Sequence, residues 1–91
     1  IDGTYVNTSY LSKNDVEIFP NPTNHSLTVQ CESNIYGYQI LDINGKKILQ
    51  SEIHPNTKVQ LNLSILPQGI YTISITLKDE MRQKKFIISP N

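Results

Sequence analysis

Apolar and polar side chains alternate with a period of two along most of this chain. The alternation is longest over 71–77, where Thr72, Ser74 and Thr76 separate larger apolar side chains. A period of two places successive side chains on opposite faces of a β-strand, so each segment has one buried and one solvated face. The pattern predicts about seven strands: Val16–Phe19, Ser26–Cys31, Tyr38–Ile43, Lys46–Gln50, Val59–Leu63, Tyr71–Leu77 and Gln83–Ile88.

The arrangement of these strands follows from their half-buried character. Strands with one apolar and one polar face belong to antiparallel sheets that leave one face in water. No window of the chain carries the apolar spacing of a helix. Short strands separated by regular turn signals favour two packed sheets. The sequence therefore predicts an all-β fold, an immunoglobulin-like antiparallel β-sandwich of about seven strands.

Proline, asparagine and glycine mark the turns between the strands. In Phe19–Pro22 two prolines fix φ and remove two backbone donors, which predicts a stiff kink between the first two strands. Asn44-Gly45 is the strongest local hairpin signal, because a two-residue hairpin turn needs positive φ at both positions. Pro67–Gly69 predicts a turn in which glycine supplies an unusual φ. We expect a loop at His54–Thr57 and a charged hairpin tip at 78–81.

The first 15 residues do not keep the alternation. Small and polar residues interrupt the apolar pairs Tyr5-Val6 and Tyr10-Leu11. We expect residues 1–15 to be a linker or the end of a preceding domain, with or without an edge strand at Gly3–Asn7, and residues 16–91 to be the folded domain. The chain opens without an initiator methionine, so we expect it to be a piece of a longer protein.

Size and charge restrict the classes of partner. The chain has 91 residues, which is enough for one domain, and its eight basic and eight acidic side chains give zero formal net charge. A nucleic-acid-binding domain carries a basic stripe, so we expect no nucleic-acid partner. No apolar run approaches the roughly 18 residues of a membrane helix, so we expect no membrane insertion.

Candidate catalytic residues are few. Cys31 is in phase with the apolar residues of its strand and is expected to be a small buried hydrophobe rather than a nucleophile. His25 and His54 lie beside turn formers and are expected to be solvated. Their spacing from Cys31 is not that of a zinc site, and the acidic start at 42–45 lacks the further ligands of a calcium loop. We therefore predict no enzyme activity, no metal and no cofactor.

One alternative is an immunoglobulin-like accessory module that binds glycan or protein. Such modules offer exposed aromatic side chains as a platform for sugars. The candidates are Tyr5, Tyr10 and Tyr36, and the chain has no tryptophan.

A set of short motifs occurs in a fixed order along the chain. They are Val16–Pro22, the strand Leu27–Val29, Asp42 with Gly45 and Lys46, Leu66 with Gly69 and Tyr71, and the basic strand Lys84–Ile88. In this order the motifs resemble the type A C-terminal sorting domain of the type IX secretion system of Gram-negative bacteria. The resemblance implies these recognition or signature residues: Pro20, Asn21, Pro22, Asp42, Gly45, Lys46, Gly69, Tyr71, Lys84 and Lys85.

The resemblance also implies a function. The domain follows a covalently fused N-terminal passenger through the periplasm and is recognised by an outer-membrane translocon. A surface sortase then removes it, within residues 1–15 or earlier, and the passenger is attached to the cell surface or released. The sorting domain is the substrate of this process and performs no chemistry.

The final strand is expected to be an edge of the sheet. An edge strand can accept a strand from a partner. Lys84 and Lys85 should point to opposite faces of it. The two lysines either protect the edge from aggregation, as lysines commonly do, or are read by the secretion machinery.

Overall fold

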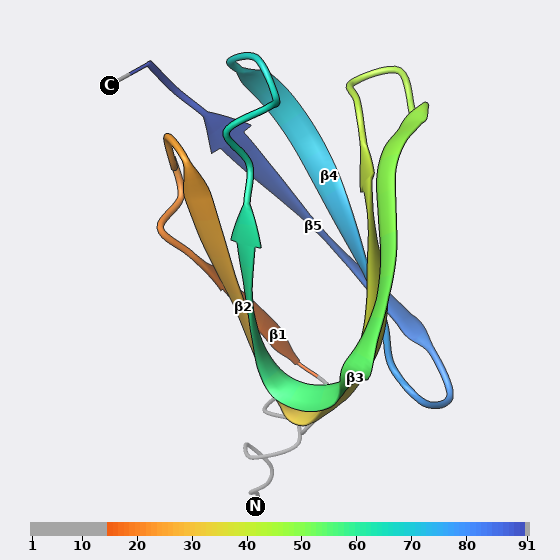
Figure 1. Cartoon of the computed structure of the whole chain (residues 1–91). Coiled ribbons are helices and arrows are strands. Elements are labelled where there is room, and N and C mark those ends of the chain that lie inside the picture. The colour runs from red at the N-terminus through yellow and green to blue at the C-terminus, as the bar shows by residue number, and fades with distance from the viewer. Residues whose placement is uncertain (1–14, 91) are drawn as a thin grey trace, which may run out of the picture.

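A computed structural model describes residues 15–90, which form one antiparallel sheet of five strands without a helix (Figure 1). The strands are β1 (Val16–Phe19), β2 (Ser26–Leu41), β3 (Lys47–Asn62), β4 (Gly69–Thr76) and β5 (Met81–Ile88). The prediction of an all-β, antiparallel fold is confirmed. The possible edge strand at Gly3–Asn7 lies outside the described residues.

The prediction of about seven strands is wrong, because expected neighbours join into two long strands. β2 contains Ser26–Cys31 together with most of Tyr38–Ile43, and β3 joins the next two expected strands. The backbone stays extended through both joins, and β-bulges shift the register of β2 against β3 there. The loop expected at His54–Thr57 is consequently part of β3. Pro55 is tolerated because β2 offers no pairing partner at that position.

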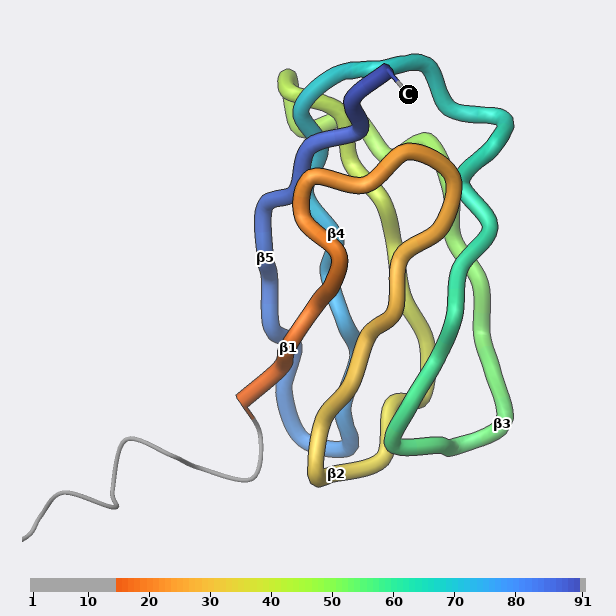
Figure 2. The backbone as a smooth tube through the Cα atoms, turned by 90° about the vertical axis from the view of Figure 1, so that its left-hand side faces the viewer, coloured from red at the N-terminus to blue at the C-terminus, as the bar shows by residue number. Residues whose placement is uncertain are grey.

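The two halves of β2 pair with different neighbours. Thr28–Cys31 pairs with β1 and Ser26–Gln30 pairs with 58–62 of β3, whereas Gly37–Leu41 pairs with β4 and with 47–52 of β3. β4 pairs in turn with β5, which gives the strand order β1-β2-β4-β5. Because β2 and β3 bend together between their halves, the sheet curls until its halves face each other (Figure 2).

The core fills the space between the facing halves of the sheet. Its side chains come from alternate strand positions, as the alternation predicts: Leu27, Val29, Ile35, Ile40, Ile73, Ile75 and Phe86. Tyr71 and Phe86 stack with ring centroids 5.7 Å apart. Cys31 is buried, as predicted. Burying one such apolar side chain contributes about 1.5–3 kcal/mol, so this core is the main source of stability.

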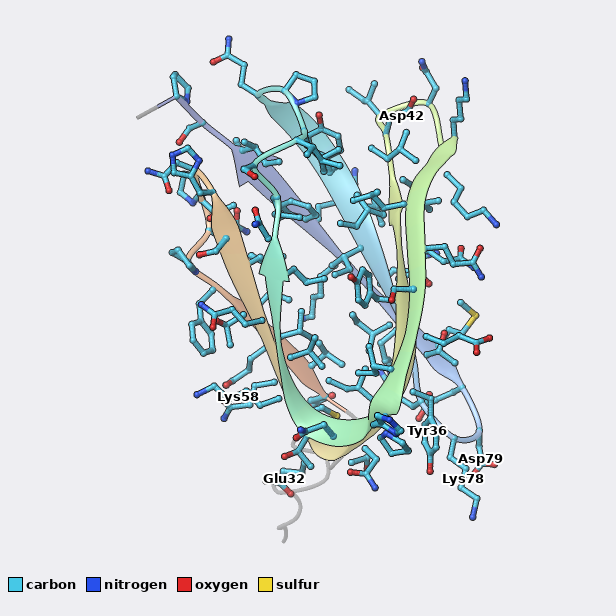
Figure 3. The ribbon with its side chains drawn as sticks, in the orientation of Figure 1. Glu32, Tyr36, Asp42, Lys58, Lys78 and Asp79 are labelled. Carbon is cyan, nitrogen blue, oxygen red and sulfur yellow. The ribbon has the colours of Figure 1, made fainter. Side chains whose placement is uncertain are left out.

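The two ends of the molecule carry different groups. The proximal end holds the start of β1, the bends of β2 and β3, and the hairpin 77–80; the distal end holds the loops 20–25, 42–46 and 63–68 and the end of β5 (Figure 2). Figure 3 shows Glu32, Lys58, Lys78 and Asp79 toward the proximal end and Asp42 at the distal end. The predicted charged hairpin tip is confirmed, since the Leu77 N–H donates to the Glu80 carbonyl.

Candidate functional site

The segment Pro20–Thr23 lies against the outer edge of β5, although the two are far apart in the sequence. Thr23 forms a parallel bridge with Ile88. The Thr23 N–H donates to the Ile87 carbonyl (2.9 Å), and the Ser89 N–H donates to the Thr23 carbonyl (2.8 Å). Thr23 is 3% exposed, and its hydroxyl donates to the Ser26 carbonyl. The kink after β1 therefore also pairs with the last strand.

The side chain of Asn21 adds two more hydrogen bonds to β5, next to those of Thr23. Its Nδ2 donates to the Lys85 carbonyl (3.3 Å), and its Oδ1 accepts the Ile87 N–H (3.0 Å). A carboxamide offers a donor and an acceptor side by side, as a peptide group does. Asn21 thus takes the place of a strand residue beside β5. The sequence predicted a bend here, which is confirmed, but not this use of the side chain. The peptide bonds before Pro20 and Pro22 are both cis.

Asp42, Gly45 and Lys46 form the turn between β2 and β3. One carboxylate oxygen of Asp42 accepts the N–H groups of Asn44 and Lys46, both at 2.9 Å. The Gly45 N–H donates to the Asp42 carbonyl, and Gly45 has φ +83°. The predicted two-residue turn at Asn44-Gly45 is wrong. The turn is longer because the Asp42 carboxylate binds backbone N–H groups within it, and only Gly45 adopts a left-handed conformation.

Gly69 and Tyr71 form a second local unit at the distal end. Gly69 has φ +156°, and a Cβ added there would lie 3.6 Å from the Tyr71 ring. The Tyr71 hydroxyl donates to the Pro67 carbonyl (2.7 Å). The unusual φ predicted for Gly69 is confirmed, but the hydrogen-bonded turn is earlier than predicted. Its hydrogen bond joins the Leu66 N–H to the Leu63 carbonyl, and the Pro67 carbonyl accepts from the Tyr71 hydroxyl instead.

Lys84 and Lys85 lie on β5 and are both exposed. Lys84 is in phase with buried Phe86 and Lys85 with exposed Ile87, which agrees with the prediction that they face opposite ways. Both line a groove of about 520 Å³ between β5 and β1. β5 ends the strand order, as predicted, but Asn21 and Thr23 cover the distal half of its outer edge.

The structure thus brings together two of the predicted signature motifs. Pro20, Asn21 and Pro22 belong to the segment that pairs with the strand of Lys84 and Lys85. The other signature residues form separate turns at the same distal end: Asp42, Gly45, Lys46, Gly69 and Tyr71. Sequence reasoning missed Thr23. Its only sequence signal is a β-branched residue directly after a proline kink, which gives no indication of a distant partner.

The His, Cys, Asp and Glu side chains of residues 15–90 do not gather into a metal site. No three His, Cys, Asp or Glu side chains in this range lie close enough together to hold a metal ion. His25 and His54 are exposed, and Cys31 is buried. The part of the chain that the structure describes also has no helix long and apolar enough to cross a membrane.

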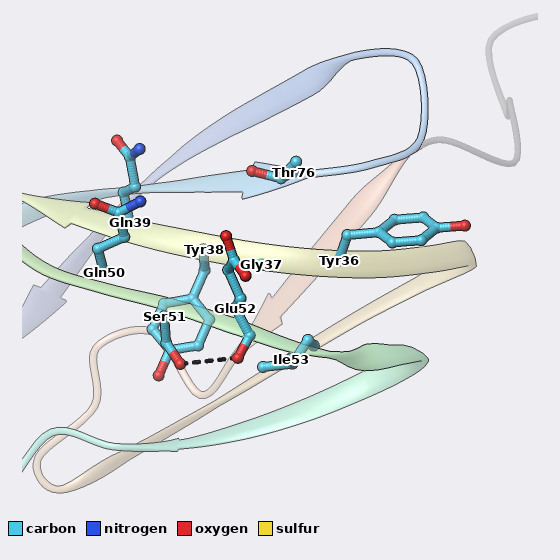
Figure 4. A pocket seen from close by; sticks show the side chains of 9 residues that line it. All are labelled: Tyr36, Gly37, Tyr38, Gln39, Gln50, Ser51, Glu52, Ile53 and Thr76. Atoms are coloured by element: carbon cyan, nitrogen blue, oxygen red, sulfur yellow. Dashed lines mark hydrogen bonds between the residues drawn. The ribbon is translucent and has the colours of Figure 1, made fainter.

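A second hollow, of about 340 Å³, lies beside Tyr36 and Tyr38 on β2 and the facing part of β3 (Figure 4). Polar groups also line it, among them Gln39, Gln50 and Thr76. Figure 4 shows the rings of Tyr36 and Tyr38 pointing in different directions. They do not form one flat platform for a sugar ring, and the other candidate aromatics, Tyr5 and Tyr10, lie outside the described residues.

Comparison with known proteins identifies the kind of domain. A family model described as a secretion system C-terminal sorting domain matches residues 17–89. An endo-acting ulvan lyase of Formosa agariphila is 28% identical over 89 residues, a match that covers 97% of this chain and 17% of that protein. The chain therefore spans about a sixth of the length of that relative.

These matches define a class, the signals that direct a fused passenger protein to secretion. Within that class, the chain belongs to the family of C-terminal sorting domains of the type IX secretion system. The resemblance seen in the sequence is confirmed. Passengers sorted by this system are exported to the cell surface or the extracellular space.

Proposed function

We propose that residues 16–91 are recognised as one folded surface by the outer-membrane translocon of the type IX system. The observation that carries the proposal is the joint between Asn21 and β5. Two side-chain hydrogen bonds there connect Asn21 to Lys85 and Ile87 of the final basic strand, 64 and 66 positions away in the chain. A translocon surface that binds this joint contacts both motifs at once. Because the joint forms only when the domain is folded, such binding distinguishes the folded domain from an unfolded one.

The order of events in secretion is part of this proposal. The domain crosses the periplasm behind its passenger, and a sortase at the surface then cuts within residues 1–15 or earlier. The position of Val16 as the first residue of β1 supports a boundary just before it. Chain segments that flank a folded domain are the usual sites of proteolytic processing. The domain itself performs no chemistry in this proposal, since it is the part removed.

A finer description of the fold is part of the proposal. The Tyr71 hydroxyl bonds a backbone carbonyl four residues upstream. Immunoglobulin-like sandwiches carry such a tyrosine at a corner between strands. This contact supports an immunoglobulin-like sandwich in which β2 and β3 each pass from one layer into the other.

A reporter-export assay tests the proposed function. Residues 1–91 are fused behind a fluorescent protein delivered to the periplasm, in hosts with and without the type IX system. We expect surface display or release only with the system, together with loss of the sorting domain. Retention of intact fusion in the periplasm of both hosts would contradict the proposal. Mass spectrometry of the released passenger gives the site of cleavage.

A further inference from the structure

The outer edge of β5 is half covered and half open. Successive residues of a paired strand direct their backbone groups alternately to the two sides. Ile87 uses its N–H and carbonyl toward Asn21 and Thr23, so Lys85, Gln83 and Met81 direct theirs to the same outer side. Within residues 15–90, no strand pairs with this side of β5. The Lys85 carbonyl already accepts from Asn21, so the open part of the edge consists of the Lys85 N–H and the outward backbone groups of Gln83 and Met81.

The groove beside this edge has a definite shape and chemistry. β1 forms its other wall, with the apolar side chains of Ile18 and Phe19. Lys84 and Lys85 provide two positive charges, against one negative charge from Glu17. Asn21 closes the groove at its distal end through its bonds to β5. The groove thus combines an apolar patch on β1 with polar and charged groups, is open to one side and is net positive.

We propose that the open edge Met81–Lys85 is a strand-acceptor site for an extended segment of a partner protein that carries carboxylate side chains. Backbone pairing would supply affinity, as in other cases of strand addition, and Lys84 and Lys85 would select acidic residues. The inference rests on the proposed sorting function, for which it defines the chemistry of the partner. It also gives both lysines a role on the two faces of one added strand.

The charges favour a different protein over a second copy of this chain. Two β5 edges paired antiparallel would bring Lys84 and Lys85 of both copies into neighbouring cross-strand positions. Like charges in such positions destabilise a sheet. The lysines therefore oppose self-association and favour an acidic strand in the same place. Edge protection and recognition are two effects of the same side chains.

Two synthetic peptides test the site directly on the isotope-labelled 91-residue chain. One is acetyl-Val-Glu-Glu-Val-Val-amide, whose adjacent glutamates face opposite ways in a strand as Lys84 and Lys85 do, and the other has lysine in place of glutamate. We expect the acidic peptide to shift the amide signals of Met81–Lys85 and to slow hydrogen exchange at Gln83. Charge pairing across an added strand makes us expect it to bind about tenfold tighter than the basic peptide. The Ile87 amide, already bonded to Asn21, should change little.

Charge reversal provides the matched control. The double variant Lys84→Glu with Lys85→Glu should invert the preference and bind the basic peptide more tightly. The double variant Lys47→Glu with Lys58→Glu makes the same charge change at exposed sites outside the groove and should keep the original preference. Both variants are first checked for an unchanged thermal midpoint, and Lys84→Ala with Lys85→Ala replaces the reversal variant if it does not fold. The alanine variant should lose the preference for either peptide.

Several outcomes would overturn the inference. They are equal affinity for the two peptides, shifts confined to another strand, no shift at millimolar peptide, and concentration-dependent pairing of β5 without peptide. The last result would mean that the edge of β5 binds a second copy of this chain rather than a different protein. The reporter-export assay keeps the two proposals apart. If the wild-type fusion is exported but the peptides give one of these outcomes, the acceptor site is wrong and the sorting function remains.

Discussion

The distal turns Asp42–Lys46 and Pro20–Thr23 obtain their hydrogen bonds in different ways. In the first, the Asp42 carboxylate binds N–H groups two and four residues away. In the second, the Asn21 carboxamide binds backbone groups 64 and 66 residues away. The first turn is specified by its own residues, whereas the second is complete only when β5 is in place. Signature motifs of similar length therefore depend on the fold to very different degrees.

Phe86→Ala is expected to have the largest effect, about 3–5 kcal/mol of lost stability, because it empties a buried aromatic site. Phe86 is 1% exposed and lies in β5 between Lys85 and Ile87, the residues that Asn21 binds. Loosening β5 should expose the Ile87 amide to exchange and leave the Asp42–Lys46 turn protected. Denaturant titration gives the stability, and hydrogen exchange compares the two turns. Equal loss of protection in both turns would contradict the comparison.

Gly45→Val is expected to cost about 1–3 kcal/mol, because a β-branched residue is strained at positive φ. Gly45 has φ +83° and no atom within 4 Å of an added Cβ, so the cost is conformational rather than steric. Exchange should quicken at the Lys46 amide and stay unchanged at Ile87. Gly45→Asn is the control, and it should cost less because asparagine tolerates this conformation. A thermal midpoint equal to that of the wild type would show that the turn does not need glycine.

Asn21→Ala is expected to have the smallest effect, about 1–2 kcal/mol, because it removes two exposed hydrogen bonds. The change should be local, with faster exchange at Ile87 and no change at Lys46. Asn44→Ala is the matched control, since Asn44 is exposed and bonds Asp42 through its backbone. If Ile87 exchanges at the wild-type rate in Asn21→Ala, the carboxamide does not hold β5.

The local turn was largely visible in the sequence, and the distant pairing was not. Asp42 and Gly45 act on residues within four positions of themselves. A hairpin was therefore predictable from the local sequence, although its exact length was not. Continuity of β2 and β3 was not predictable, because the residues at the joins resemble a loop. Pro55 and Asn56 are turn formers by type, yet both belong to β3, where Asn56 pairs with Ile35 of β2 and Pro55 has no partner.

At the candidate site, contacts between residues far apart in the sequence were even harder to predict. Alternation predicted that Lys84 and Lys85 face opposite ways on an edge strand, which the burial of Phe86 and Ile88 supports. No local pattern reveals that Asn21 and Thr23 cover the distal half of that edge. Such a contact depends on how far the whole sheet curls, and that follows from packing of the core rather than from any single motif.

The joint between Asn21 and β5 has a consequence for synthesis of the chain. Proteins emerge from the ribosome from the N-terminus, at about 5–20 residues per second, and early segments begin to fold first. Asn21 and Thr23 are made among the first residues of the domain, but their partners Lys85, Ile87 and Ser89 are made among its last. A chain that stops short of these residues leaves the joint unmade. The joint therefore closes only after the chain has been translated at least as far as Ser89.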